Sequence, residues 1–425
     1  MSILFFPPTN KKLIETIRLG WRQIPLPVRQ RFWTLIGGDL RGFYARQMLA
    51  RPSLEIADPN EPFVIAGLFS TANGIGEAAR STYRSLRSAG VAAIAVDLSE
   101  QLASVDLKPD IPCQSMPTAK NGTLLLQLNA PETMAALHHL GMRRDREWRT
   151  IGYWAWELPQ FPQDWDKAFT FLSEIWTISS FAADAIASHK LAPKTHIFPH
   201  AISAPHTRVD RQQFGWSDDC FVFLTMADAM SSMGRKNPFK TITAFNTAFG
   251  NDPSRHLVVK TRNLDKWPDA RKDLEHAIEG LSNVTLLDAA LSEDDKWVML
   301  NSADALISLH RSEGFGLTLA ESMALGKPVV TTAWSGNMDY ACEQSAYLVD
   351  YDLIPCSDVY GVYKQTNTHW AEARLGSAVD QMKKVAEDEA TRDQKASYAK
   401  QKLNEWASSE RIGKLMADHL FPRYR

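Results

Sequence analysis

The chain has 425 residues, of which 44% are hydrophobic and 23% charged, and its formal net charge at pH 7 is −2. A chain of this length exceeds one typical hydrophobic core, so we expect two or three domains. The near-neutral charge excludes a general nucleic-acid binder, which would carry a clear basic excess. A disulfide framework and a zinc knuckle are excluded as well, because there is no C-x-x-C pair among the four cysteines, Cys113, Cys220, Cys342 and Cys356.

The sequence carries no sign of membrane insertion or export. No stretch approaches the roughly 18 uninterrupted apolar residues of a membrane-spanning helix. The start of the chain also lacks the basic beginning and long apolar core of a signal peptide. We therefore expect the protein to remain in the cytoplasm.

Residues 1–51 differ in charge from the rest of the chain. Nine Lys and Arg residues occur there against only Glu15 and Asp39, and nine minus two gives +7, so the remainder carries −2 − 7 = −9. Apolar and aromatic residues such as Trp21 and Trp33 separate these charges. Such segments commonly lie on anionic membrane surfaces, but a helical extension packed on the body has the same composition. We assign residues 1–60 to a basic amphipathic N-terminal extension and leave both interpretations open.

From Pro62 onward, apolar strands alternate with helices. The first predicted helix covers 76–89, and the predicted strands cover 63–69, 92–96, 123–128, 151–154, 175–178 and 196–199. Repeated strand–helix units with apolar strands predict a parallel, doubly wound sheet. Residues 61–205 are therefore expected to form a Rossmann-like domain.

A second series of strands and helices follows. Its predicted strands cover 220–226, 256–261, 284–287, 304–310 and 329–332. Pro238 opens one helix, and Ser292 with Asp295 forms a capping box ahead of another. We expect residues 206–395 to form a second Rossmann-like domain that faces the first across a cleft. Residues 396–425 are expected to form a helical tail that packs back across the first domain.

The stretch 304–340 places two carboxylates around the start of one helix. A buried strand leads into a loop that carries Glu313, and a helix then opens at about Gly316. Gly326 ends this helix in the position that a left-handed C-cap favours. Glu313 therefore lies at the mouth of the helix, and Glu321 lies a little over one turn into it.

This arrangement suits a nucleoside diphosphate sugar. The positive end of a helix attracts phosphate, and Gly314 and Gly316 let the backbone approach it closely. Glu321 can then accept hydrogen bonds from a ribose, and Glu313 from a sugar beyond the phosphates. The amides that would face the phosphates belong to Phe315, Gly316, Leu317 and Thr318.

Glu313 and Glu321, with Gly314-Phe315-Gly316 between them, resemble the E-x7-E signature of the retaining GT-B glycosyltransferases of group 1. Gly326-Lys-Pro-Val-Val and Trp334-Ser-Gly-Asn also resemble that family, and the likeness extends over roughly residues 60–405. The resemblance implies a GT-B fold in which the first domain takes the acceptor and the second takes the donor. It also implies that Glu321 holds the nucleotide ribose while Glu313 approaches the donor sugar. A nucleotide diphosphate sugar is then the co-substrate, with no cofactor and no metal in the active site.

Three cations are candidates for stabilising the departing diphosphate. Arg235 and Lys236 follow the first strand of the second domain, and Lys260 ends the second strand, where ligands of open parallel sheets bind. The family usually places an Arg directly after the first strand and a Lys a few residues later. Here Asp228 holds the Arg-like position and Lys236 the Lys-like one. The second cation stays open between Lys260 and Arg235, and surface cations at a helix start are the alternative for all three.

The loop after the first strand supports a rival function. Gly74-x-Gly76-x-x-Ala79, with Asp97 about twenty residues on, matches a dinucleotide fingerprint and would indicate an NAD(P)-dependent dehydrogenase. However, four residues separate the strand from Gly74, whereas the fingerprint needs the glycine almost at once. The family resemblance instead implies that Gly74 and Gly76 face the donor phosphates.

Candidates for the acceptor site come from the first domain. Asn129 follows one predicted strand, and the aromatic run 153–156 ends another, with Trp156 and Glu157 at its close. Trp rings commonly stack on sugars and a carboxylate can orient a hydroxyl, but core packing explains the aromatic residues equally well. Asp350 and Asp352 formally match the metal motif of the other glycosyltransferase fold, although a solvated acidic loop is the better interpretation.

The sequence therefore predicts a retaining hexosyltransferase. It would move a hexose from a nucleotide diphosphate sugar to a saccharide or lipid-linked saccharide acceptor, in the synthesis of cell-surface polysaccharide or lipopolysaccharide. Residues 1–51 would place it on an anionic membrane surface, at the inner face. The alternatives are the dehydrogenase and a non-catalytic sugar-binding protein with the same fold.

Overall fold

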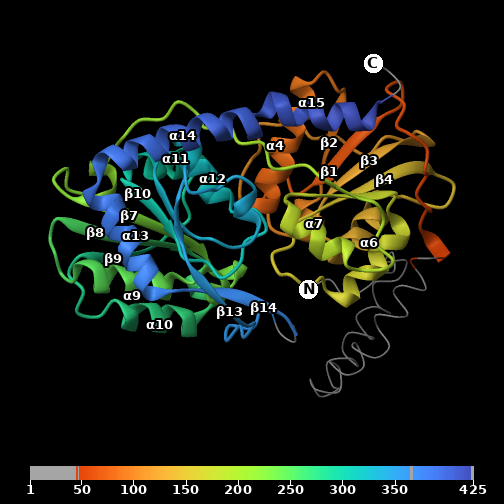
Figure 1. The fold of residues 1–425 in the computed structure, drawn as a ribbon. Coiled ribbons are helices and arrows are strands. Elements are labelled where there is room, and N and C mark those ends of the chain that lie inside the picture. Colours follow the sequence, from red (N-terminus) through yellow and green to blue (C-terminus); the bar gives the residue numbers. More distant parts are fainter. Residues whose placement is uncertain (1–44, 46, 364–366, 423–425) are drawn as a thin grey trace.

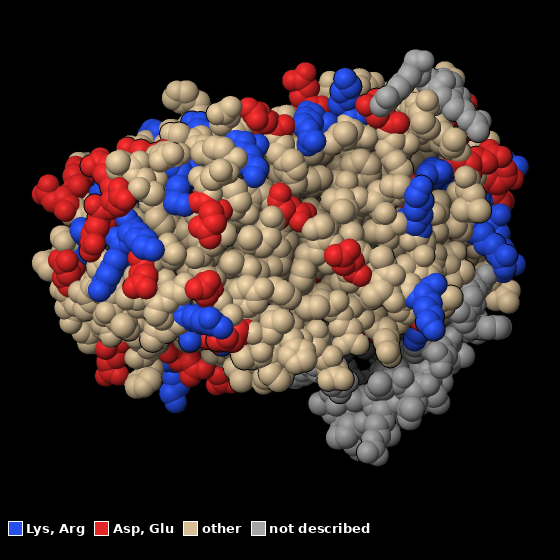
Figure 2. All heavy atoms as spheres, viewed as in Figure 1, with Lys and Arg blue, Asp and Glu red and all other residues tan. Residues whose placement is uncertain are grey.

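The computed structural model describes residue 45, residues 47–363 and residues 367–422, and it contains two six-stranded sheets side by side (Figure 1). Residues 1–44 and 46, which make up most of the predicted amphipathic extension, lie outside the described part. Within that part, no helix is both long enough and apolar enough to cross a membrane. On the face shown in Figure 2, acidic and basic side chains are interspersed, so this face offers no extended surface of one sign.

The first sheet has the strand order β2-β1-β3-β4-β5-β6, and all its pairs are parallel. Its central strands are buried because helices cover both faces, as expected for apolar runs in a parallel sheet. The strands are β1 (Phe63–Gly67), β2 (Ala93–Asp97), β3 (Asn121–Gln127), β4 (Glu147–Trp154), β5 (Glu174–Thr177) and β6 (Thr195–Ile197). The helices are α4 (Gly74–Ser88), α5 (Ser99–Leu102), α6 (Ala130–His139) and α7 (Ser180–Ala187), with a 3₁₀ segment at Gln163–Phe171.

The second sheet has the order β12-β11-β10-β7-β8-β9, again all parallel. The strands are β7 (Phe221–Asp228), β8 (Arg255–Arg262), β9 (Val284–Asp288), β10 (Ala305–Ser308), β11 (Val329–Thr332) and β12 (Tyr347–Val349). The helices are α8 (Met233–Lys236), α9 (Pro238–Phe249), α10 (Pro268–Ala277), α11 (Glu293–Ser302) and α12 (Leu317–Leu325). From β7 the chain winds outward one way and from β10 the other way, so the loops after β7 and β10 meet at the point where ligands of such sheets bind.

The C-terminal part joins the two domains. An antiparallel hairpin of β13 (Tyr351–Pro355) and β14 (His369–Ala373) precedes three helices, α13 (Leu375–Glu387), α14 (Glu389–Ala407) and α15 (Ser409–Leu420). In Figure 1, α14 runs along the second domain and α15 continues over the first, where it packs on α4. The predicted pair of Rossmann-like domains is confirmed. Of the predicted tail, residues 396–407 belong to α14 on the second domain, and α15 lies on the first domain.

Candidate active site

Lys236 and Glu313 meet at the junction between β7 and β10. Lys236 Nζ lies 2.5 Å from Glu313 Oε1, although the two residues are 77 positions apart. The loops that carry them are bonded to each other, since Asn237 Nδ2 donates to the Leu309 carbonyl at 3.1 Å. The crossover topology therefore creates a contact that the spacing along the chain does not reveal.

Arg235 holds the Glu313 loop from behind. Its guanidinium donates to the Ser312 carbonyl at 2.7 Å and lies 3.1 Å from Glu313 Oε2. The residue is only 4% exposed. Arg235 was predicted as a catalytic cation. In the structure it contacts Glu313, but its own side chain is buried. It therefore positions Glu313, and Lys236, whose side chain is 23% exposed, is the cation that solvent reaches.

The charge state of Glu313 follows from these two neighbours. Burial alone would raise the pKa of Glu313, but Lys236 and Arg235 outweigh burial and hold that pKa well below its ordinary value. The backbone amide of Glu313 also donates to Ser335 Oγ at 2.8 Å. Glu313 is therefore an ionised, fixed acceptor for hydroxyl groups.

The amino end of α12 is open to an anion. Gly316 precedes the helix in a left-handed conformation with φ of 84°, and no side chain of the described residues caps that end. A Cβ atom at Gly316 would lie 2.9 Å from Leu319 Cδ1 and from Tyr340 Oη, so only glycine fits there. The first amides of α12 belong to Leu317 and Thr318, and a phosphate bound at this end stays a prediction.

Gly314 is needed for a different reason than the one predicted. A Cβ atom there would lie 2.7 Å from the carbonyl oxygen of Trp156, which belongs to the first domain. Ser179 Oγ of the first domain also donates to the Gly314 carbonyl at 2.5 Å. Gly314 thus permits close contact between the two domains beside Glu313.

Glu321 lies farther along α12 at a pocket between the domains. The pocket has a volume of about 70 Å³ and its lining includes Glu77, Arg84, His200, Trp297, Leu317 and Glu321. Lys296 Nζ lies 2.7 Å from Glu321 Oε1 and 2.8 Å from Glu293 Oε1. Burial raises the pKa of Glu321 above its ordinary value, with Lys296 opposing the rise.

Lys260 and Arg262 lie near the end of β8. Their side chains share one face of the sheet, because they are two residues apart on a strand. Arg262 Nη2 lies 2.7 Å from Asp228 Oδ2, and Arg262 also donates to the carbonyl of Ala72 in the first domain. Lys260 is 6% exposed and has no hydrogen-bond or ion-pair partner among the described residues. Burial, with help from Arg262, lowers the pKa of Lys260 to about 8. A buried cation without a partner is well suited to an anionic ligand.

The structure weakens the dinucleotide interpretation of the first loop. Both oxygens of Asp97 are occupied, because Ser70 Oγ donates to one at 2.5 Å and Ser99 Oγ to the other at 2.6 Å. A Cβ atom at Gly76 would lie 2.1 Å from the Thr71 carbonyl, so this glycine serves the packing of the loop itself. Gly74, by contrast, is exposed at the first turn of α4 and has open space around it.

The predicted acceptor residues take different places. Asn129 Oδ1 accepts from the amide of Ala155 at 2.9 Å, which fixes the loop after β4. Trp156 is 7% exposed and packs edge-on against Trp165 with ring centroids 4.9 Å apart, so it belongs to the core. Glu157 reaches the second domain: Tyr363 Oη donates to its carboxylate, and Arg235 Nε lies 3.7 Å away.

Residues 208–352 match the family model described as Glycosyl transferases group 1. We call the second domain, which contains this match, the group 1 domain. The resemblance predicted from the two glutamates, which both lie inside the matched range, is thereby confirmed.

The group 1 domain and its partner domain together resemble solved GT-B structures. HepE of Anabaena, solved with UDP and glucose, has a TM-score of 0.61 at 15% identity and covers 85% of this chain and 100% of its own. Sucrose-phosphate synthase of Thermosynechococcus elongatus has a TM-score of 0.62 at 12% identity and covers 84% and 98%. WaaG, a glycosyltransferase involved in lipopolysaccharide biosynthesis, has a TM-score of 0.56 at 14% identity, and the match covers 84% of this chain and 99% of WaaG. These likenesses confirm the predicted fold, and no curated protein matched the chain significantly.

Three residues of the group 1 domain were missed by sequence reasoning. Arg262 could have been found, because it shares a strand face with Lys260. Lys296 lies on a different helix from Glu321, and Tyr363 comes from the connection between β13 and β14, so neither gave a local signal. Asp352, from the suspected metal motif, is exposed as predicted but lies in strand β13 and not in a loop, and its carboxylate lies 2.5 Å from Arg374.

Proposed function

We propose that this protein is a retaining glycosyltransferase that moves a hexose from a nucleoside diphosphate sugar to a saccharide or lipid-linked saccharide. The observation that carries the proposal is the contact between Lys236 and Glu313 beside the uncapped amino end of α12. A cation, an ionised carboxylate and open helix amides are what a diphosphate and its sugar require. A dehydrogenase would leave this arrangement without a use.

Each part of the donor has a matching group in the site. In the proposed complex the diphosphate lies at the amino end of α12, and Lys236 and Lys260 neutralise its charge. The ribose hydroxyls donate to Glu321, and the sugar hydroxyls donate to Glu313. Ligand pockets usually have volumes of about 300–1,000 Å³, whereas the pocket at Glu321 has about 70 Å³. We therefore propose that the two domains move apart to admit the nucleotide and close again around it.

The reaction proceeds on one face of the sugar. The acceptor oxygen bonds to the anomeric carbon on the side from which the diphosphate leaves. The bond between carbon and phosphate oxygen breaks with its electron pair going to the diphosphate, which takes the proton of the acceptor hydroxyl. Lys236 and the dipole of α12 stabilise the charge that develops on the diphosphate. This scheme keeps the anomeric configuration and assigns no role to a metal, a cofactor or an enzymic nucleophile.

The acceptor side of the proposal is supported by Glu157 and by analogy. Glu157 lies on the first domain beside Arg235, so an acceptor hydroxyl next to the donor sugar would meet its carboxylate. WaaG, which shares the fold, is involved in lipopolysaccharide biosynthesis. We propose a cell-surface polysaccharide or lipopolysaccharide intermediate as the acceptor, with the enzyme at the inner face of the membrane through residues 1–51. Sedimentation with anionic vesicles, with and without these residues and across a salt series, tests that placement.

A donor screen tests the function itself. UDP-glucose is the first donor to try, because HepE was solved with it, and other UDP- and GDP-hexoses follow. The expected result is tight binding of one free nucleoside diphosphate and release of that nucleotide when an acceptor is added. NMR coupling of the new anomeric proton then reports retention or inversion. Binding of NAD(P)H with no affinity for any nucleoside diphosphate would refute the proposal.

A further inference from the structure

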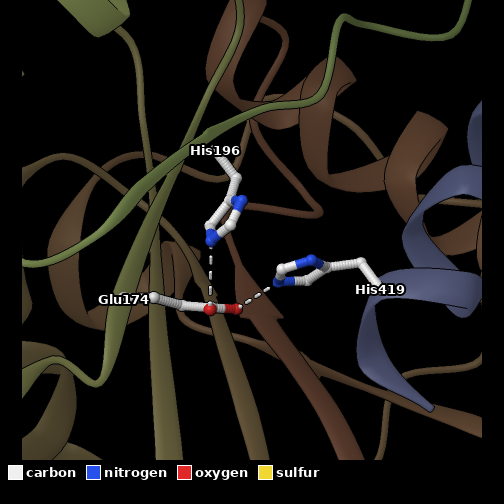
Figure 3. Close-up of side chains that lie close together, drawn as sticks. All are labelled: Glu174, His196 and His419. Carbon is white, nitrogen blue, oxygen red and sulfur yellow. Dashed lines mark hydrogen bonds and ion pairs between the residues drawn. The ribbon is translucent and has the colours of Figure 1, made fainter. Parts of the chain in front are cut away.

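A second polar cluster, drawn in Figure 3, lies where β5 begins, whereas Ser179, which contacts Gly314, follows the other end of that strand. Glu174 is the first residue of β5, His196 is the middle residue of β6, and His419 lies near the end of α15. The three side chains converge although they come from three separate elements. The cluster has no part in the proposed transfer reaction.

The geometry of the cluster is that of a metal site with nitrogen and oxygen ligands. Glu174 Oε1 lies 3.0 Å from His419 Nε2, and Glu174 Oε2 lies 3.7 Å from His196 Nε2. One ligand atom from each residue can be chosen so that all three lie within 4.8 Å of one another. Bonds of about 2.0–2.2 Å to zinc place neighbouring tetrahedral ligands roughly 3.3–3.6 Å apart, so small side-chain shifts would complete the site.

His196 needs a partner that the described residues do not supply. Its Nε2 is buried and makes no hydrogen bond, and 3.7 Å is too long for one to Glu174. A buried polar nitrogen without a partner is costly. A metal ion between the three side chains would satisfy it.

The carboxylate is already held in place by groups outside the cluster. Trp176 Nε1 donates to Glu174 Oε1 at 2.9 Å, and Arg149 Nη2 donates to Glu174 Oε2 at 2.9 Å. Such outer partners orient the ligands of metal sites. The charge of Arg149 opposes a cation, so a site of moderate affinity is expected.

The cluster is also accessible. It opens onto a pocket of about 450 Å³, whose lining includes Arg149, Lys194 and Asp418 besides the three ligands. A three-ligand site that faces such a space leaves room for water as the fourth ligand.

We propose that Glu174, His196 and His419 bind one Zn²⁺ ion, which fastens the C-terminal helix α15 to the sheet of the first domain. Two imidazoles and one carboxylate suit zinc better than magnesium or calcium, which prefer oxygen ligands. Because α15 follows α14 directly, the ion would also secure the connection that carries the chain from the second domain to the first.

The test uses the full chain, free of any histidine tag and treated with a chelator. Zn²⁺ alone is titrated in while heat release and the melting temperature are measured. We expect one equivalent to bind and the melting temperature to rise with zinc concentration. His196→Ala and His419→Ala should each lower the affinity at least about tenfold, since even outer partners of zinc sites are worth 10–100-fold. His276→Ala is the matched control, because His276 is an exposed histidine that pairs with Glu279.

Two results would overturn the proposal. One is absence of binding at submillimolar Zn²⁺. The other is binding of unchanged affinity in both cluster variants, which would assign the ion to other residues, such as the cysteines. His196→Ala leaves α15 intact and therefore remains informative if His419→Ala does not fold. Co²⁺ in the wild-type chain supplies an independent reading through its visible absorption, which distinguishes a four-coordinate ion from a hydrated one.

Discussion

Glu313 and Glu321 lie eight residues apart and are almost equally buried, at 7% and 4% exposure, yet their surroundings differ. Two cations, Lys236 and Arg235, hold Glu313 and keep its pKa well below the ordinary value. Glu321 has one cation, Lys296, which it shares with Glu293, and burial raises its pKa. Equal burial therefore accompanies opposite shifts in pKa, because cations surround Glu313, whereas Glu321 has the carboxylates of Glu293 and Glu77 near it besides Lys296.

This difference indicates that the two glutamates have different roles. Glu313 is fixed on both oxygens, which suits a group that must present one unchanging geometry to a reacting sugar. Glu321 faces the pocket between the domains, and among the described residues no group bonds to its second oxygen. A carboxylate of this kind is ready to accept hydrogen bonds from a ligand that enters and leaves.

The largest effect is expected from Lys296→Met, which removes the cation that pairs with Glu321. Removing one partner of a buried ion pair costs about 3–5 kcal/mol of the free energy of unfolding. The variant raises the pKa of Glu321 further above its unfolded value of 4.5. The neutral form is tolerated, so the loss is smallest below pH 4.5 and grows as the pH rises through the folded pKa.

Urea denaturation at about pH 5 and pH 8 checks this prediction. Lys272→Met, at an exposed position of α10, is the matched control and should change little at either pH. An equal loss of stability at both pH values would show that Lys296 contributes packing and does not control the charge of Glu321.

Lys236→Ala tests the other side of the comparison. Arg235 still holds Glu313 in this variant, so the fold and the donor affinity should change little. The charge on the departing diphosphate loses its nearest partner, and turnover should fall about 10²- to 10³-fold. Lys240→Ala is the control, since Lys240 pairs with Glu372 away from Glu313. If saturating donor restores full turnover, Lys236 acts in binding and Lys260 becomes the candidate for the leaving group.

The strands and helices that carry this site could be predicted from the sequence because their signals are local. Gly326 has a φ of 80° and ends α12 at Leu325, as a helix pattern followed by glycine indicates. Strand ends were less certain: β4 begins at Glu147, four residues before the predicted strand, because polar residues alternate with buried ones there. Fold class and both glutamates were therefore within reach of sequence reasoning.

The partners of the glutamates could not be predicted from the sequence. Lys296 and Glu321 are 25 residues apart on separate helices, and Tyr363 is 206 residues from Glu157. Such pairs form only through tertiary packing, and the periodicity of the sequence does not predict them. The hairpin of β13 and β14 was also missed, because its strand Tyr351–Pro355 is mostly exposed and carries no apolar run.

Lys260→Met should stabilise the protein while weakening nucleotide binding. Burial lowers the pKa of Lys260 from 10.5 to about 8 in the folded protein, a difference equivalent to up to about 3 kcal/mol. The cost of burying the charge is fully present below pH 8 and disappears above pH 10.5. The variant should therefore gain most at pH 7, and the gain should shrink by pH 10. Thermal unfolding at pH 7 and pH 10 checks the gain in stability, and calorimetric titration with UDP checks the loss of nucleotide affinity. Lys266→Met, at an exposed lysine, is the control.

The smallest effect is expected from Tyr363→Phe, which acts on Glu313 only through Glu157 and Arg235. The phenol donates to Glu157, whose side chain is 24% exposed, so water can replace the lost donor and the stability cost should be about 1 kcal/mol. Glu157 then aligns less well beside Arg235, and kcat/KM for the acceptor should fall several-fold. Affinity for the free nucleotide should not change, because Glu321 and Lys296 are untouched. Tyr360→Phe, which removes a hydroxyl bonded to Asp273, is the matched control. A weaker affinity for the nucleotide in Tyr363→Phe, with the control unaffected, would mean that the surroundings of the two glutamates are coupled and do not act separately.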